Sequence, residues 1–230
     1  MLDFNSIARH PQDPSFLVID NPAQLGGNRS WRQHGIRGAF YDISKHRNFS
    51  IEPLQKDAVD FALYCLKELA TKAAKPDARG ATLRMREKDD AFNLDSIISL
   101  GQTHSDAYSF TLNADDSLRR LTADAPRSLQ QLFSFIMQYR KLLKQIFNDT
   151  SFRFRINTQY PEDFHIHDGS RTITTTMSLN QEGTEIKAPD GTPYKVPVGV
   201  LASLDWDVYH RATQIPFIEL EQSPRVTLVF

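Results

Sequence analysis

The chain has 230 residues, of which 40% are hydrophobic and 24% are charged, and this composition predicts one globular domain rather than a disordered or collagen-like chain. Its 27 lysine and arginine residues nearly balance 28 aspartate and glutamate residues, so a net charge of −1 gives no electrostatic signature of nucleic-acid or membrane-surface binding. The lone cysteine, Cys65, excludes an internal disulfide and a zinc site built mainly from thiolates.

The N-terminal segment gives no sign of targeting to a membrane. Charges and Pro11 interrupt residues 1–13 before an apolar run can develop. Elsewhere no apolar stretch approaches the roughly 20 residues that a spanning helix needs. We therefore expect neither a signal peptide nor a membrane span, and we expect a cytoplasmic protein.

The first predicted elements are a short strand, a loop and a helix. Residues 16–20 (FLVID) predict the strand, and the Asn, Pro and Gly content of residues 21–30 predicts the loop. A helix is predicted from about Pro53 to Ala74. Its apolar face repeats at steps of four, three and four residues, at Val59, Leu63, Leu66 and Ala70.

A second helix is predicted after a capping residue at Asp124 and a proline, Pro126, in the first turn. Its apolar stripe consists of Leu129, Leu132, Phe133, Ile136, Leu143 and Phe147. We expect Asn148 and Asp149 to end it. Between the two helices, the Ser, Thr and aromatic content of residues 91–113 favours short strands.

After Thr150 the pattern is typical of β structure. Residues 152–157 (FRFRIN) alternate apolar and polar side chains with the period of a half-buried strand. Further strand candidates are residues 163–167 (DFHIH), 171–179 (RTITTTMSL), 194–204 (YKVPVGVLASL) and 225–230 (RVTLVF). Strands at this spacing, separated by turns and without a helical pattern between them, favour a sandwich or jelly roll.

These elements predict an α+β protein with a single domain over residues 1–230. A helical N-terminal part with some strands, residues 1–150, is expected to pack on a β core formed by residues 151–230. Two helices with apolar stripes need a sheet face to cover, and the β segment is too short to bury a core alone.

Three histidines form a candidate metal site. His165 and His167 lie two residues apart in a predicted strand, so both side chains face one side. His210 follows the apolar segment ending in DWDVY, and pairing of distant strands can bring it beside the first two. Three imidazoles can hold a divalent metal, and Asp168 in place of one nitrogen gives the two-histidine, one-carboxylate triad of non-haem iron.

An arginine near the C-terminus forms a second feature. Arg225 opens the last predicted strand, and Thr227 shares its face. An arginine inside a barrel needs an anionic partner, and a guanidinium binds a carboxylate in two-pronged fashion while a nearby hydroxyl adds one hydrogen bond. The alternative is an arginine at a sheet edge that pairs with Glu219 or Glu221 on the surface.

Taken in order, the segments FHIHD, RTITTTMSLN, EGTEI, VPVGVLASLDWDVYH and PRVTLVF resemble the double-stranded β-helix core of Fe(II)- and 2-oxoglutarate-dependent oxygenases. The resemblance covers about residues 151–230, and uncharacterised bacterial oxygenase-like proteins are the nearest group. It implies that His165 and His210 bind Fe(II) and that Arg225, with Thr227, holds the C5 carboxylate of 2-oxoglutarate. Further contacts with the cofactor or substrate are expected from Tyr160, Thr174, Thr176 and Asn180.

The chain departs from the family motif at the second ligand, because His167 stands where the family has Asp or Glu. Three arrangements stay open for the metal. His167 is the second ligand; or a kink lets Asp168 coordinate; or His167 is the first ligand and Gly169 stands at the carboxylate position, as in iron halogenases. A degenerate site that holds no metal is the fourth alternative.

The resemblance implies an Fe(II)- and 2-oxoglutarate-dependent dioxygenase that hydroxylates a small molecule or a side chain. Two other classes stay open at this point. A three-histidine, cupin-type metal dioxygenase would need no 2-oxoglutarate, and a non-enzymatic β-domain that binds a partner would need no metal.

Overall fold

The computed structural model describes residues 4–21, 24, 31–46, 49–73, 125–146, 153–157, 163–166, 173–181, 183–213 and 225–229. For residues 65–73, 140–146 and 153–157 the description covers the backbone. The helices are α1 (Ile51–Ala73) and α3 (Arg127–Ile146), with short 3-10 turns at η1 (Phe4–Ser6), η3 (Arg32–His34) and η4 (Ile43–Lys45). The strands are β1 (Arg9–His10), β2 (Asp13–Ile19), β3 (Gly38–Asp42), β4 (Arg153–Asn157), β5 (Thr174–Ser178), β6 (Thr184–Lys187), β7 (Pro193–Lys195), β8 (Val200–Leu204), β9 (His210–Ala212) and β10 (Arg225–Val229).

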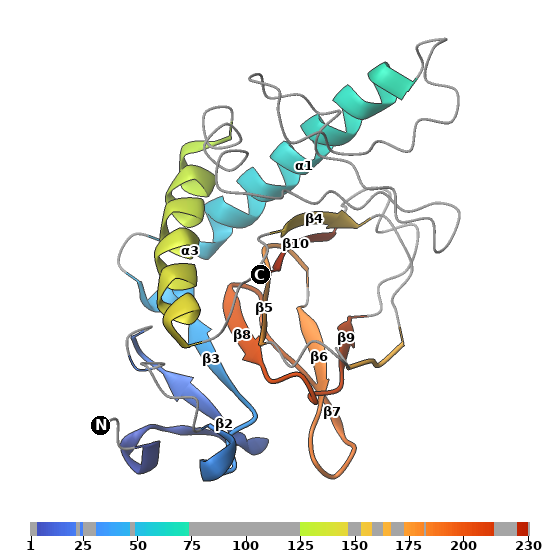
Figure 1. Cartoon of the computed structure of the whole chain (residues 1–230). Coiled ribbons are helices and arrows are strands. Elements are labelled where there is room, and N and C mark those ends of the chain that lie inside the picture. Colours follow the sequence, from blue (N-terminus) through green and yellow to red (C-terminus); the bar gives the residue numbers. More distant parts are fainter. Residues whose placement is uncertain are drawn as a thin grey trace.

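The strands form two sheets that face each other (Figure 1). The major sheet has the order β1-β2-β3-β8-β5-β10-β4, with β2 and β3 parallel and its other neighbours antiparallel. The minor sheet has the order β7-β6-β9, and an antiparallel bridge between His165 and His210 adds residues 163–166 beside β9. This is a mixed β architecture with few helices, and its strand order is consistent with the expected jelly roll.

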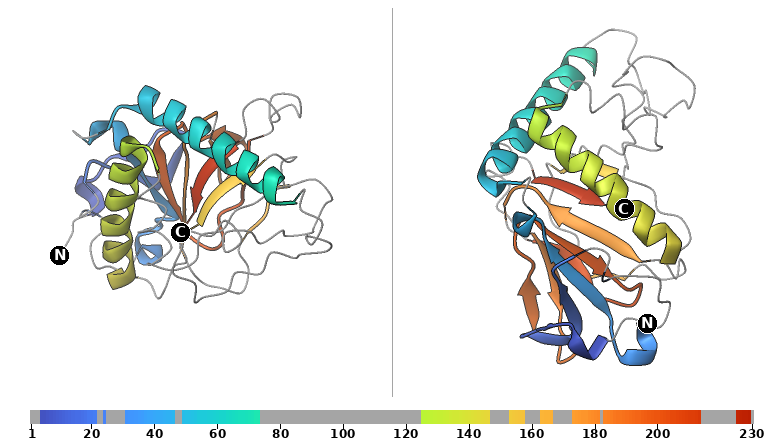
Figure 2. Two further views of the ribbon diagram at one scale, coloured as in Figure 1. Left: turned by 90° about the horizontal axis from the view of Figure 1, so that it is seen from above. Right: turned by 90° about the vertical axis from the view of Figure 1, so that its left-hand side faces the viewer.

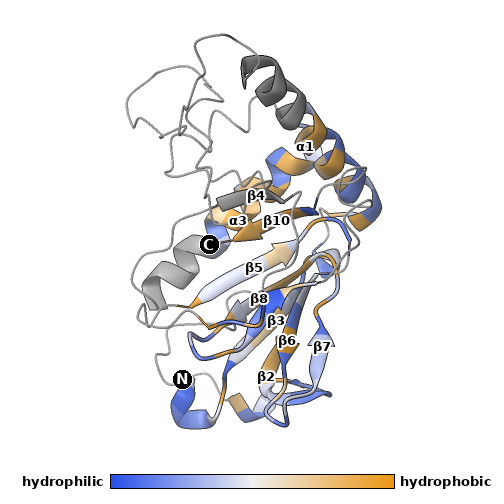
Figure 3. Cartoon of the chain, turned by 90° about the vertical axis from the view of Figure 1, so that its right-hand side faces the viewer, coloured by the Kyte–Doolittle hydropathy of each residue, from blue (hydrophilic) through white to orange (hydrophobic). Residues whose placement is uncertain are grey.

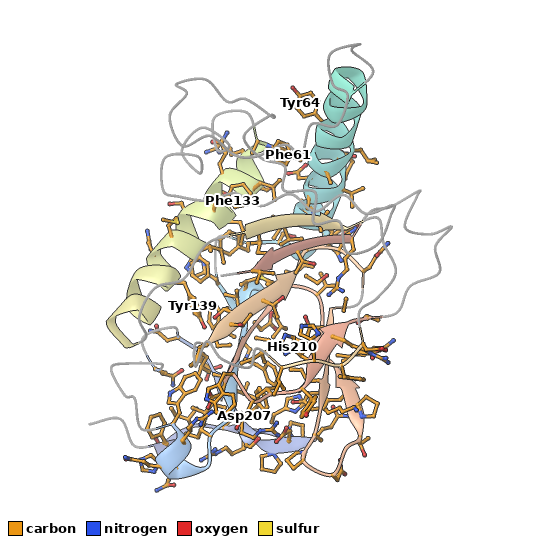
Figure 4. The ribbon with its side chains drawn as sticks, turned by 45° about the vertical axis from the view of Figure 1, so that its right-hand side comes forward. Phe61, Tyr64, Phe133, Tyr139, Asp207 and His210 are labelled. Carbon is orange, nitrogen blue, oxygen red and sulfur yellow. The ribbon has the colours of Figure 1, made fainter. Side chains whose placement is uncertain are left out.

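Both helices lie on one face of the major sheet (Figures 1 and 2). Their buried side chains share one apolar cluster with strand residues such as Leu201, Val226 and Leu228. Figure 3 shows apolar segments of α1 close to β10, and Figure 4 shows Phe61 and Phe133 between the two helices. The helices therefore cover this face with apolar side chains.

The two helices were predicted with different success. The stripe of α3 is confirmed at Leu129, Leu132, Phe133 and Ile136, all of which are fully buried. For α1 the side chains are described up to Tyr64, and there the predicted apolar face is wrong, because Leu63 is 40% exposed and the buried residues are Leu54, Ala58, Phe61 and Ala62. The predicted positions Leu66 and Ala70 lie outside the described side chains. The two small alanines among the buried residues allow close packing but give little hydrophobic signal in a sequence pattern.

The space between the sheets holds a second apolar cluster. The major sheet contributes Phe16, Phe40, Ala202 and Leu204, and the minor sheet contributes Ile186 and Tyr194. Because side chains alternate along a strand, each strand of the major sheet divides its residues between the helix-covered face and this interior.

The strand predictions differ from the structure at two places, and a third lies outside the described residues. The strand predicted over residues 194–204 is two strands, β7 and β8. Pro197 cannot donate to a ladder and Gly199 has a φ of 76°, where a Cβ would overlap the side chain of Ile51. The strand β3 was missed. The strands predicted over residues 91–113 lie outside the described residues.

In the parts of the chain that the structure describes, neither α1 nor α3 combines the length and the apolar character needed to cross a bilayer.

Candidate metal and cofactor site

Two of the predicted metal ligands lie side by side in the minor sheet. His165 and His210 are direct cross-strand partners and exchange both backbone hydrogen bonds, each with an N···O distance of 3.0 Å. Their ring centroids are 4.7 Å apart and the rings are inclined by 53°. Strand pairing thus brings together two imidazoles from distant parts of the chain, as the sequence predicts.

The two rings are oriented by the same local contact. Nδ1 of His165 lies 3.0 Å from the carbonyl oxygen of Asp163, and Nδ1 of His210 lies 2.9 Å from that of Val208. A carbonyl oxygen can only accept a hydrogen bond, so each Nδ1 carries the proton. A neutral ring with Nδ1 protonated has its lone pair on Nε2, the nitrogen that a metal would bind.

The separation of the rings also suits a metal. Two imidazoles bound at right angles to one ion, with metal–nitrogen distances of about 2.1 Å, would have ring centroids about 4.6 Å apart. The observed 4.7 Å is close to this separation. The donors are neutral nitrogens, which suit iron and other first-row transition metals.

The other two predicted ligands, His167 and Asp168, lie outside the described residues, so the choice between them stays a prediction. Within the described ranges, no group of three or more His, Cys, Asp or Glu side chains converges on one point. The described part of the candidate centre is therefore the pair His165 and His210.

The register shows which way the pair faces. Across the minor sheet, His165 pairs with His210, His210 with Ile186, and Ile186 with Tyr194. Directly paired residues point to the same side of a sheet, and Ile186 and Tyr194 pack against the major sheet. The two histidines therefore face the interior, and His210 is 7% exposed (Figure 4).

Tyr194 is the last residue of this cross-strand row, and its hydroxyl is uncharged. Burial raises the pKa of its hydroxyl, and the nearby carboxylate of Asp13 raises the pKa further. The hydroxyl donates to Oδ2 of Asp13 at 3.4 Å.

Arg225 reaches this interior from the opposite sheet. It is 4% exposed, and it lies on the face of β10 opposite to Val226 and Leu228, which pack under the helices. Its Nη2 donates to the carbonyl oxygen of Gly183 at 3.1 Å. Gly183 directly precedes β6, so the guanidinium connects the two sheets at the start of that strand, three residues before the Ile186 that pairs with His210.

Thr227 shares this face, as predicted. It is 5% exposed, and its Oγ1 is buried and makes no hydrogen bond within the part of the chain that the structure describes. A buried hydroxyl without a partner is costly. A hydrogen-bonding ligand beside Arg225 would remove that cost, so the position fits a bound carboxylate.

The remaining predicted contacts have separate positions. On β5, Thr176 pairs with Ala202, and Thr174 pairs with Leu204, so both threonines face the interior. Asn180 is buried, and its Oδ1 accepts from the backbone N–H of Val226 at 2.6 Å, which ties the end of β5 to β10. Tyr160 lies outside the described residues.

The sequence did not reveal the role of Gly183. Its carbonyl oxygen accepts from Arg225, from the backbone of Thr213 at 3.3 Å and from the Thr213 hydroxyl. A Cβ at Gly183 would overlap the carbonyl oxygen of Val196. The glycine in the EGTEI segment was the available signal, but a turn motif does not disclose which carbonyl it presents.

Comparison with known proteins gives structural likenesses alone. No protein-family model matches the sequence, and no curated protein matches it. Among solved structures, a full-length Neurospora crassa protein in complex with alpha-ketoglutarate and thymine is similar at 11% identity and a TM-score of 0.48, with 96% of this chain and 86% of that chain covered. A C-terminally truncated form of the Neurospora crassa protein in the apo form gives 12% identity and a TM-score of 0.46, with 99% and 98% covered.

A Pseudomonas putida prolyl-4-hydroxylase is similar at 16% identity and a TM-score of 0.31, with 76% of this chain and 80% of that chain covered. Other similar solved structures are described as a putative oxygenase from Shewanella oneidensis and a putative 2OG-Fe(II) oxygenase family protein from Caulobacter crescentus. At these identities and TM-scores the likeness carries no information on the reaction, which has to be inferred from this chain's own residues.

Proposed function

We propose that the chain is a non-haem Fe(II)- and 2-oxoglutarate-dependent dioxygenase, built on a double-stranded β-helix, that hydroxylates a small molecule or a side chain. The observation that carries the proposal is the placement of a histidine pair and a buried arginine on facing sheets of one interior. His165 and His210 lie on the minor sheet, while Arg225 comes from the major sheet and reaches the start of β6.

The histidines account for metal binding. His165 and His210 offer Nε2 to Fe(II), since both Nδ1 atoms are engaged by backbone carbonyls. The third ligand is His167 or Asp168. Bound Fe(II), with 2-oxoglutarate as co-substrate, supplies the activation of O₂ that hydroxylation requires.

The arginine and threonine account for binding of 2-oxoglutarate. Arg225 offers a planar pair of N–H donors to the C5 carboxylate, and the Thr227 hydroxyl adds one hydrogen bond. Burial strengthens both interactions because they do not compete with bulk water.

The test is an anaerobic titration of the full chain with Fe(II) and 2-oxoglutarate, monitored for the visible metal-to-ligand charge-transfer band. We expect the wild type to form the band and His210→Ala to lose it. Arg225→Ala should weaken binding of 2-oxoglutarate about 30-fold or more, because it removes a charged hydrogen-bonding partner from a buried carboxylate. Circular dichroism checks that both variants are folded.

Exposed His34 provides the control, since His34→Ala removes a histidine remote from the pair. This variant should retain the band. Metal binding without the band in the wild type would favour the three-histidine dioxygenase that uses no 2-oxoglutarate. If the wild type binds no metal at micromolar concentration, both metal-dependent functions are wrong.

A further inference from the structure

An aromatic ring contacts two cations on the outer face of the minor sheet, the face opposite to the histidine pair. The guanidinium carbon of Arg211 lies 4.2 Å from the centroid of the Phe164 ring, and Nζ of Lys187 lies 4.6 Å from the same centroid. Both distances are within the range of cation–π attraction. Phe164 precedes His165, and Arg211 follows His210, so the contact joins the two segments that carry the histidines.

The arginine of this contact is held in place from a third strand. Nε of Arg211 donates to Oε2 of Glu185 at 2.7 Å, and Arg211 and Glu185 are cross-strand partners in β9 and β6. Their side chains are 20% and 11% exposed. Glu185 therefore fixes the guanidinium on the same outer face on which the Phe164 ring lies.

The two histidines are held differently. His210 lies in β9, which pairs with β6 on one side and with His165 on the other. In the described residues 163–166, His165 joins the sheet through the two backbone hydrogen bonds that it exchanges with His210. Contacts of Phe164, the neighbouring residue, with the minor sheet therefore add to the forces that hold this segment beside β9.

We propose that Phe164 is a positioning residue for the metal site. Through its contacts with Arg211 and Lys187, its ring holds residues 163–166 against β9 and so keeps the His165 imidazole beside that of His210. This inference rests on the proposed function, because it assumes that the pair binds a metal.

The experiment measures binding of Co(II), a stand-in for Fe(II) that is stable in air, to the full chain by calorimetry and by the visible Co(II) spectrum. Phe164→Leu keeps an apolar side chain but removes the ring face. We expect the Kd for Co(II) to rise about tenfold in this variant, with a changed spectrum, since two cation–π contacts are lost. Phe164→Tyr keeps the ring and should stay within about twofold of the wild type.

A matched control is available at the other histidine. Tyr209 precedes His210 as Phe164 precedes His165, and its ring lies 5.9 Å from Nζ of Lys187. It is 48% exposed, and β9, which begins at the next residue, pairs with β6 on one side and with His165 on the other. Tyr209→Leu should therefore change the Kd for Co(II) less than about twofold.

The cation–π contact can also be weakened from the side of the lysine. Lys187→Met leaves Phe164 in place and removes one cation from a partly exposed position, so the Kd for Co(II) should rise about threefold. Amide hydrogen exchange at His165 and His210 should accelerate in Phe164→Leu even without metal, because these two amides donate to each other's carbonyl oxygens. Exchange at Lys187, whose amide donates to the carbonyl oxygen of Tyr209, should stay slow.

The outcomes separate the two proposals. If the wild type binds Co(II) and Phe164→Leu binds it equally well, Phe164 is not a positioning residue. Equal losses in Phe164→Leu and Tyr209→Leu would contradict it as well, because they would indicate general destabilisation. If the wild type binds no Co(II) but the His165 amide is deprotected in Phe164→Leu, the positioning role of Phe164 is upheld and the metal-dependent function is wrong.

Discussion

The two faces of strand β10 carry opposite kinds of side chain. On β10, Val226 and Leu228 are fully buried under the helices, whereas Arg225 and Thr227 face the interior between the sheets. On β5, Met177 belongs to the helix-covered cluster, whereas Thr174 and Thr176 face the interior.

The difference shows how a short β segment can serve stability and chemistry together. Burial of apolar area on the helix-covered face stabilises the folded state. The interior face includes polar groups that cost free energy unless a partner satisfies them. Neighbouring residues on one strand are thus expected to respond in opposite ways to substitution.

The largest expected effect is on the helix-covered face. Leu228→Ala removes a fully buried side chain from the cluster formed by the helices and the sheet. We expect the free energy of unfolding to fall by about 2–5 kcal/mol, from lost burial and the cavity that is left. Urea denaturation measures this loss, and binding of Fe(II) by the folded fraction should be unchanged. A fall in metal affinity as large as the fall in stability would contradict the separation of the two faces.

The neighbouring residue on β10 gives the opposite prediction. Thr227→Val keeps the shape of the side chain and removes a buried hydroxyl that makes no hydrogen bond in the described residues. We expect the free energy of unfolding to rise by about 1 kcal/mol, which for a chain of this size raises Tm by roughly 2–4 °C. The affinity for 2-oxoglutarate should fall about tenfold, because the hydroxyl no longer donates to the bound carboxylate.

Thermal unfolding and the anaerobic titration measure the two quantities in the same preparation. Thr175→Val is the control, since it makes the same change on the opposite face of β5, where the Thr175 hydroxyl lies 3.0 Å from that of Ser203, and it should leave binding of 2-oxoglutarate unchanged. Destabilisation by Thr227→Val together with unchanged binding of 2-oxoglutarate would show that the hydroxyl has a structural role.

The β10 comparison also explains how far the sequence was informative. Period-two alternation correctly predicted that Arg225 and Thr227 share a face, and that two distant histidines meet when their strands pair. These inferences succeed because strand geometry alone decides which way a side chain points. Assigning a chemical role to the interior needed the second sheet, which no local pattern specifies.

The failures have equally local causes. Strand β3 is buried on both faces, so Gly38–Asp42 lacks the alternation that identifies a half-exposed strand. A Cβ at Gly38 would overlap the ring of Phe16, which explains a glycine where a strand pattern expects a branched residue. The contacts of Phe164 were not predictable either, because they depend on Arg211 and Lys187 arriving from two other strands.

The smallest expected effect is a pH dependence of stability that comes from His10, which lies at the far end of the interior from Arg225. His10 stacks on Tyr194 with ring centroids 5.2 Å apart and meets the edge of Phe40 at 5.0 Å. Burial lowers the pKa of His10 below 6.5, and the carboxylate of Asp13 partly opposes that shift. The ring is therefore held neutral by its surroundings.

This lowered pKa makes stability depend on pH in a defined direction. As the pH falls through about 6.5, the unfolded chain takes up a proton before the folded chain does, so the folded state loses stability. The loss ends once the pH is below the lowered pKa of the folded state. His10→Phe keeps the aromatic contacts and cannot titrate, so its free energy of unfolding should vary less between about pH 7 and pH 5 than that of the wild type. Urea denaturation at several pH values measures the difference, and exposed His34→Gln should leave the pH dependence as it is. An equal flattening in both variants would mean that burial of His10 is not its source.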